Sequence, residues 1–201
     1  MDLFQPDPAA NLLPCDGIVT YHGRILGDKE ARNYYDRLNS TVPWQHDEVV
    51  IFGKRIVTAR QVAWYGDAGF SYTYSGTTKQ ALPWTHELRE LKAVAEARAG
   101  IVFNSCLLNL YHDGREGMGW HSDDERSLAR NGCIASMSFG AERKFSFRHK
   151  RTKETVSVML ESGSLLLMAG ETQTHWHHQL PKSMKVATPR INLTFRTMAK
   201  P

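Results

Sequence analysis

The stretch RINLTFR, residues 190–196, alternates polar and apolar side chains along its whole length. Successive side chains of a β-strand point to opposite faces, so the pattern predicts a strand with one polar and one apolar face. The polar face carries Arg190, Asn192, Thr194 and Arg196. One interpretation is a surface strand whose polar face meets solvent. The other is a strand whose guanidinium groups and amide point into a barrel, where two arginines would match a dicarboxylate.

Short strand-like runs separated by turn residues fill most of the chain after residue 100. They are FNSCLLNLY (103–111), CIASMSF (133–139), KFSFRH (144–149), ETVSVML (154–160) and SLLLMA (164–169). Many short strands of this kind are typical of a sandwich or of a barrel-like jelly roll. Helical segments come earlier in the chain, so the sequence predicts an α+β class that is mainly β.

Two segments in the first half of the chain have helical patterns. Asp28 can cap a helix over roughly 29–39. The second helix is predicted within residues 83–100, where leucines and an alanine share one face at helical spacing. Pro83 and Thr85 suit the start of that helix. Gly100 suits its C-terminal end, because glycine adopts the left-handed conformation common there.

Two histidine-containing motifs suggest a metal site. His121 and Asp123 are two positions apart, and on a strand such side chains share a face, so both can reach one ion. The stretch THWHHQLP supplies His175, His177 and His178. One of these would complete a two-histidine, one-carboxylate set, which is typical of non-haem Fe(II) oxygenases. A solvated turn and an exposed loop with one core histidine are the alternatives.

Alternation along a strand separates the three clustered histidines. It puts His175 and His177 on one face and His178 on the other, without showing which face looks inward. The motif NLY adds an amide, Asn109, and a phenol, Tyr111, on one face of a strand that leads toward the first histidine motif.

Length and composition limit the class of protein. A chain of 201 residues fits a single domain over 1–201, with a loose arm at about 1–14. Its net charge of +4 permits nucleic-acid binding without requiring it. Scattered cysteines and an N-terminus unlike a signal peptide predict an intracellular protein, cytoplasmic or, in a eukaryote, nuclear. No apolar run approaches the ~20 residues of a membrane span, and we expect a monomer.

The NLY, HSD and RINLTFR motifs, together with His178, resemble the AlkB family of Fe(II)/2-oxoglutarate-dependent dioxygenases in order and spacing. The resemblance runs from about residue 14 to 198. VVIFGK, YGDAGFSYTYSG, SFGAERKFSFRHK and THWHHQLP resemble the branch that repairs duplex DNA. The family fold is a double-stranded β-helix, which is a jelly roll. The resemblance implies N-terminal helices, a nucleotide-recognition lid at about 45–76 and a jelly-roll core at about 100–198.

The resemblance also implies a role for each motif. The iron ligands would be His121, Asp123 and His178. The 2-oxoglutarate site would consist of Asn109, Tyr111, Arg190, Asn192, Thr194 and Arg196. The implied reaction uses Fe(II), 2-oxoglutarate and O2 to demethylate N-alkylated DNA bases, typically 1-methyladenine and 3-methylcytosine. Its other products are succinate, CO2 and formaldehyde.

A methyl group inside a duplex cannot reach a buried iron, so the damaged nucleotide must be flipped out. Phe52 precedes Gly53 between VVI and KRIV, in a predicted hairpin whose tip is usually polar. Either the hairpin folds back and buries Phe52, or Phe52 is a wedge that fills the vacated space in the base stack. The resemblance favours the wedge, with Gly53 and Lys54 against the DNA backbone and Arg60 near the opposing strand.

Other DNA contacts follow from the same resemblance. Tyr74 would stack on the flipped base and Tyr72 would reach a phosphate, with core packing as the alternative for Tyr72. Base stacking on an aromatic ring contributes roughly 1–3 kcal/mol. Asp124 and Glu125 would contact the base and favour cationic, methylated bases over neutral ones.

The run RKFSFRHKRTK, residues 143–153, has six Lys or Arg residues and no acidic residue. A solvated rim is the usual role of such a run, and a phosphate-facing patch is the functional one. We expect four of these residues to dominate the salt dependence of DNA binding: Arg143, Arg148, Lys150 and Arg151.

Two other functions compete with DNA repair. The same chemistry on RNA or protein is one, and a non-catalytic β-barrel binding module is the other. A wedge at Phe52 argues against the first, because it is useful only in a duplex. The strand with two arginines argues against the second, because a binding module has no need of a 2-oxoglutarate site.

Overall fold

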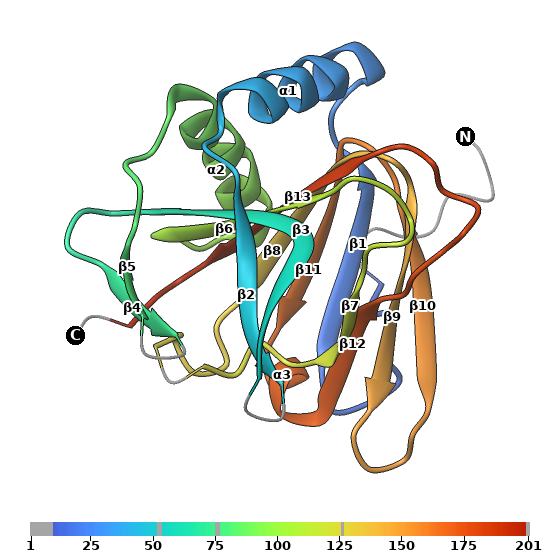
Figure 1. Ribbon diagram of the computed structural model, residues 1–201. Coiled ribbons are helices and arrows are strands. Elements are labelled where there is room, and N and C mark those ends of the chain that lie inside the picture. The colour runs from blue at the N-terminus through green and yellow to red at the C-terminus, as the bar shows by residue number, and fades with distance from the viewer. Residues whose placement is uncertain (1–9, 52–53, 75–76, 126, 200–201) are drawn as a thin grey trace.

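The computed structural model describes residues 10–51, 54–74, 77–125 and 127–199; at 49–51, 54–55, 71–74 and 77–79 it describes the backbone alone. Two antiparallel sheets face each other, and the two longer helices pack against the larger sheet (Figure 1). The helices are α1 (Asp28–Thr41), α2 (His86–Ala99) and the short α3 (Thr172–His175). This arrangement confirms the predicted class, which is mainly β, and is consistent with a jelly roll.

Seven strands form the larger sheet, in the order β1 (Ile18–Arg24), β11 (Ser164–Ala169), β8 (Ile134–Gly140), β13 (Arg190–Arg196), β6 (Ser105–Tyr111), β3 (Lys54–Gly66) and β2 (Gln45–Ile51). Four strands form the smaller sheet, in the order β10 (Thr155–Leu160), β9 (Arg143–His149), β12 (Trp176–Leu180) and β7 (Met118–His121). A separate pair consists of β4 (Ser71–Tyr74) and β5 (Thr77–Gln80).

The RINLTFR stretch is strand β13, at the centre of the larger sheet between β8 and β6. Its apolar residues Ile191, Leu193 and Phe195 are fully buried in the core that the sheet shares with the helices. The opposite face of the strand therefore looks toward the smaller sheet and not toward solvent. The interpretation of this segment as a surface strand is wrong.

A second core lies between the two sheets. Val19 and Met168 of the larger sheet pack there with Phe147 and Trp176 of the smaller one. These side chains hold β9 and β12 against the larger sheet.

The ends of the two longer helices differ in how well the local sequence predicts them. Helix α2 begins after Thr85, whose side chain accepts the Leu88 amide at 3.3 Å, and ends at Gly100 with φ of 67°. Both features match the prediction. Helix α1 begins at Asp28 itself, with Gly27 as the N-cap residue, so Asp28 is not the cap. Instead, Asp28 forms an ion pair with Arg24.

The predicted hairpin around residues 49–59 is confirmed as strands β2 and β3. Strand β3 pairs with β2 along one part and with β6 along another, so the hairpin extends from an edge of the larger sheet. No helix among the described residues is long and apolar enough to cross a membrane.

Candidate active site

A cavity of about 1600 Å³ lies beside the polar face of β13, and residues of both sheets line it. The four polar residues of RINLTFR all reach this cavity, as do Asn109 and Tyr111 on β6. Strand pairing explains this convergence, because Arg190 lies opposite Tyr111 and Asn192 lies opposite Asn109. The fold thus brings together two motifs that are almost 80 residues apart in the sequence.

His121, Asp123 and His178 gather at the wall of this cavity. His178 on β12 pairs in register with His121 on β7, so their rings are 4.2 Å apart between centroids. The Asp123 Oδ1 atom is 3.8 Å from His121 Nε2 and 3.9 Å from His178 Nε2. The three donor atoms all lie within 4.8 Å of one another, so together they could hold a single metal ion.

Strand β7 ends at His121, so Asp123 is not on the strand as the spacing argument assumed. A hydrogen bond from the Asp123 amide to Gln173 Oε1, at 2.9 Å, fixes the backbone at this point. The carboxylate is only 8% exposed. Gln173 was not predicted, because nothing in the local sequence of α3 signals a contact with a residue 50 positions away.

The surroundings of these three residues suit metal binding. The Nδ1 atom of His121 lies 2.8 Å from the Gly119 carbonyl, to which it can only donate, so in the neutral ring Nε2 is the nitrogen that can bind a metal. Burial lowers the pKa of His178 to about 3, which keeps the ring neutral. Burial alone would raise the pKa of Asp123, but Arg196 and the two histidines outweigh it and lower the pKa. Metal ligation requires these deprotonated forms.

Of the three clustered histidines, the fold brings only His178 to the cavity. His175 belongs to helix α3 and pairs with Glu171, so the prediction that it shares a strand face with His177 is wrong. His177 lies opposite Arg148 in the register of the smaller sheet and is partly exposed.

Arg190 is a buried cation, only 2% exposed. Its Nη2 donates to Ser138 Oγ at 2.9 Å, and its guanidinium carbon is 5.7 Å from the Tyr111 ring centroid. Burial lowers its pKa to about 10, so it is still charged at neutral pH. No carboxylate among the described residues pairs with it, and its Nε atom has no hydrogen-bond partner there. A buried guanidinium in this state is suited to an anionic ligand.

Other members of the predicted 2-oxoglutarate set have different surroundings. The Asn109 Oδ1 atom is buried without a hydrogen-bond partner among the described residues. Asn192 donates to Ser136 Oγ and the Met137 carbonyl, and its Oδ1 atom accepts from Thr194. Arg196 Nη2 lies 2.9 Å from Asp123 Oδ2, so this arginine contacts the metal-binding carboxylate directly.

Several residues that we predict to contact DNA lie outside the part of the chain that the structure describes, or have no described side chain. Phe52 and Gly53 are not among the described residues, and the side chains of Lys54, Tyr72 and Tyr74 are not described. The backbone of the two tyrosines forms β4, which pairs with β5.

Arg60 and the acidic pair have defined positions. Arg60 is buried, forms an ion pair with Asp47 and donates to Met118 Sδ at 3.3 Å, so in this structure its guanidinium is engaged within the protein. Glu125 lines the cavity, and its Oε2 atom is buried without a hydrogen-bond partner among the described residues. Asp124 is exposed and is not among the residues that line the cavity.

The basic run divides into a buried part and an accessible part. Arg143 is 2% exposed and donates from Nη2 to the carbonyls of Glu116 and Pro181, both at 2.9 Å. The prediction that Arg143 faces phosphate is therefore wrong, because strand β9 points it inward. Arg148 is partly exposed, with its guanidinium carbon 4.4 Å from the Trp120 ring centroid.

Comparison with known proteins gives concordant results. The family profile described as 2OG-Fe(II) oxygenase superfamily matches residues 17–196. DNA oxidative demethylase ALKBH2 of Mus musculus is 42% identical over 209 residues, covering 97% of this chain and 85% of that protein. Alpha-ketoglutarate-dependent dioxygenase alkB homolog 3 of Homo sapiens is 41% identical over 180 residues, covering 85% and 62%.

Among solved structures, that of OsALKBH1 superposes with a TM-score of 0.60 at 16% identity, covering 92% of this chain and 99% of that one. At this identity the likeness concerns the fold alone.

Proposed function

The chain belongs to the AlkB family of the 2OG-Fe(II) oxygenase superfamily, and from that premise we propose that it repairs alkylated DNA by oxidative demethylation of 1-methyladenine and 3-methylcytosine. As a member of the superfamily it is an Fe(II)- and 2-oxoglutarate-dependent dioxygenase that uses O2. The observation that carries the proposal is the metal-binding set His121, Asp123 and His178 in the same cavity as Arg190, a buried cation that pairs with no carboxylate among the described residues.

The residues present fit both groups. His121, Asp123 and His178 would hold the iron, since their donor atoms are close enough for one ion and are of the types that bind it. When bound, iron and 2-oxoglutarate supply the activation of O2 and the oxidising power for the methyl group.

Arg190 would bind the distal carboxylate of 2-oxoglutarate, with Tyr111 beside it. The hydrogen bond from Arg190 to Ser138 already fixes the guanidinium, so little side-chain freedom is lost on binding. Asn109, Asn192 and Thr194 line the same wall, and Arg196 would hold Asp123 in place for the metal.

Base selection would depend on the acidic side of the cavity. Glu125 presents a buried oxygen without a partner among the described residues, which suits the exocyclic amino group of a flipped base. Methylation at N1 of adenine or N3 of cytosine makes the base cationic, and the Glu125 carboxylate in the cavity wall would favour it electrostatically over the neutral base. We expect duplex DNA to be the preferred substrate, because the sequence has Phe52 between strands β2 and β3, where it would enter the base stack.

Activity assays on matched substrates test this proposal. The purified chain with Fe(II), ascorbate and 2-oxoglutarate should release formaldehyde from 1-methyladenine in duplex DNA while 2-oxoglutarate is converted to succinate. The single strand and the same sequence as RNA should react at lower rates. His178→Ala should abolish turnover, and His177→Ala should retain most of it. Formaldehyde released from RNA but not from DNA would assign the enzyme to RNA, and no formaldehyde from any of them would refute base demethylation.

A further inference from the structure

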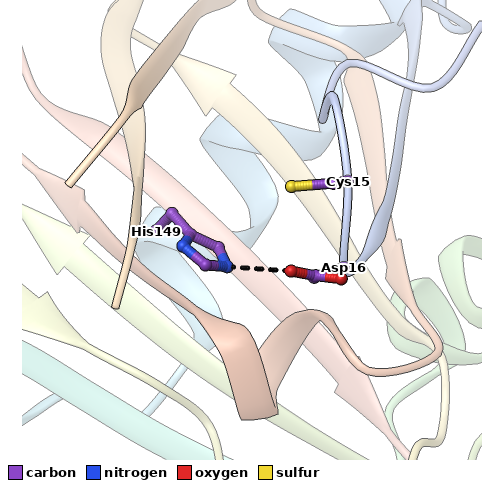
Figure 2. Close-up of side chains that lie close together, drawn as sticks. All are labelled: Cys15, Asp16 and His149. Atoms are coloured by element: carbon purple, nitrogen blue, oxygen red, sulfur yellow. Dashed lines mark ion pairs between the residues drawn. The ribbon is translucent and has the colours of Figure 1, made fainter. Parts of the chain in front are cut away.

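A second group of metal-binding side chains lies outside the cavity. Cys15, Asp16 and His149 each offer one donor atom, and these atoms all lie within 4.8 Å of one another (Figure 2). The first two come from the segment before β1, and His149 ends strand β9. None of the three lines the active-site cavity.

We propose that these three residues bind a thiophilic divalent cation, with zinc as the occupant. A thiolate, a carboxylate oxygen and an imidazole nitrogen are the donors that zinc takes in proteins, and three of them leave a fourth tetrahedral position for water. Figure 2 shows the side chains of Cys15 and Asp16 on the same side of their segment, facing the His149 ring. Cys15 and Asp16 are exposed, which gives a cation a path from solvent, whereas His149 is 1% exposed and rigidly held.

The charges around the thiol favour a cation. Partial desolvation, then Asp16 and then Glu154 raise the pKa of Cys15, and Arg151 is the opposing charge. The group is therefore a protonated thiol at neutral pH in the absence of metal, which argues against a reactive cysteine. A divalent cation would take the place of the thiol proton and would be attracted by the same carboxylates that hold that proton on sulfur.

The His149 ring must change its tautomer when metal binds. Its Nδ1 atom accepts the Thr152 amide at 3.0 Å, so the neutral ring carries its single proton on Nε2, 3.2 Å from Asp16 Oδ2. Coordination through Nε2 requires the other neutral tautomer, in which that one proton lies on Nδ1. The Thr152 hydroxyl, 3.1 Å from Nδ1, can then accept a hydrogen bond from it. The amide of Thr152 must give up its bond to the ring, and this turn is exposed, so the rearrangement meets little packing.

The site would cross-link the N-terminal segment to the smaller sheet. The Cys15 carbonyl already accepts the Trp176 indole N–H at 3.0 Å, and the His149 ring lies edge-on to that indole at 4.9 Å. Trp176 is fully buried and begins strand β12, which carries His178 two residues later. A cation at Cys15 would therefore stabilise the strand that supplies one of the proposed iron ligands, without entering the active-site cavity.

Cobalt(II) distinguishes this site from the iron site, because only the proposed site contains sulfur. The full chain, stripped of metal and titrated with Co²⁺, should develop a thiolate-to-cobalt charge-transfer band in the near ultraviolet that added Zn²⁺ removes. Cys15→Ser should lose the band completely, and Asp16→Asn should weaken Co²⁺ binding. Asparagine also tolerates the left-handed backbone of Asp16, whose φ is 53°, so this variant should fold.

Two controls complete the test. Cys133→Ser and His178→Ala should both keep the band, since neither residue belongs to the proposed site. Zinc should also accelerate hydrogen exchange at the Thr152 amide, which loses its ring acceptor. Absence of the band in the unmodified chain, or its persistence in Cys15→Ser, would overturn the proposal and leave the three residues as a contact without a metal. Either result is independent of whether the chain demethylates DNA.

Discussion

Arg190 illustrates at the residue scale how a surface-type pattern can become a ligand site. A buried guanidinium is costly unless it is paired, and among the described residues Arg190 contacts the Ser138 hydroxyl and the Tyr111 ring but no carboxylate. An anionic ligand would offset the cost of burying this charge. The guanidinium is already positioned in the cavity, which is why we propose that it binds a carboxylate of 2-oxoglutarate.

Replacing this residue by lysine gives the first prediction. Arg190→Lys keeps the charge but loses the planar fork, so the KM for 2-oxoglutarate should rise by about 10- to 100-fold, equivalent to about 1.5–3 kcal/mol for a hydrogen bond to a charged group. The KM for methylated DNA should change little. Steady-state kinetics with each substrate varied in turn checks this split, and an equal rise in both KM values would contradict the assignment.

At the scale of a single element, strand β9 shows why neighbouring basic residues can differ in exposure. Alternate residues of the strand point to opposite sides, so Arg143 enters the protein while Arg148 stays at the surface beside Trp120. The net charge of the run is the same in either case. Which of its members reach DNA is decided by the direction of each side chain.

The two arginines should therefore behave differently when each is changed to alanine. Arg143→Ala leaves the Glu116 and Pro181 carbonyls without their donor and should lower the free energy of unfolding by at least about 2 kcal/mol. Arg148→Ala should leave stability nearly unchanged and reduce the slope of log K against log salt for duplex DNA by about 0.9, if it neutralises one phosphate. Denaturant titration and binding at several salt concentrations measure these effects, and a stable Arg143→Ala with a reduced slope would contradict them.

The β2–β3 hairpin carries the third prediction. Phe52→Ala should lower kcat/KM on methylated duplex DNA, by an amount equivalent to a rise of about 1–3 kcal/mol in activation free energy. The reason is that no aromatic ring would then fill the space that the flipped base leaves in the stack. Activity on the methylated single strand should fall much less. Met159→Ala, an exposed apolar residue on β10, serves as the control and should affect neither substrate. Equal losses on duplex and single strand would eliminate the wedge.

At the scale of the whole molecule, the cavity couples ligand binding to stability. The active-site donors come from β6 and β13 of the larger sheet and from β7, β12 and the loop after β7 in the smaller one, so a bound metal and cosubstrate would tie the two sheets together. The folded state alone has this assembled set of donors, and ligands that bind it shift unfolding by mass action.

Removing the ligands should therefore lower the melting temperature. Metal and 2-oxoglutarate at 100 times their Kd values each add ~2.7 kcal/mol, and for a domain of this size ~1 kcal/mol shifts Tm by ~2–4 °C. Chelation should reverse a stabilisation of several degrees, measured anaerobically by calorimetry. In Arg190→Lys, the shift due to metal should remain and the shift due to 2-oxoglutarate should shrink. Identical shifts in both proteins would place 2-oxoglutarate elsewhere.

Features set by near neighbours in the chain could be predicted from sequence. The alternation of RINLTFR defines a strand with a polar face, and the Thr85 and Gly100 signals define the ends of α2. These properties follow from side-chain geometry and backbone preferences within a few residues. The motif set also resembled one family closely enough to indicate an iron and 2-oxoglutarate enzyme, which the comparisons confirm.

Only the tertiary structure decided which side chains meet. Strand alternation left three histidines open to metal and only the family resemblance indicated His178, whereas the pairing of β12 with β7 places His178 directly opposite His121. Burial of Arg143 and the grouping of Cys15 with His149 likewise depend on contacts between distant segments. Local patterns specify the direction of a side chain relative to its own strand. Sheet order and register specify what lies in that direction, and they are fixed by packing of the whole chain.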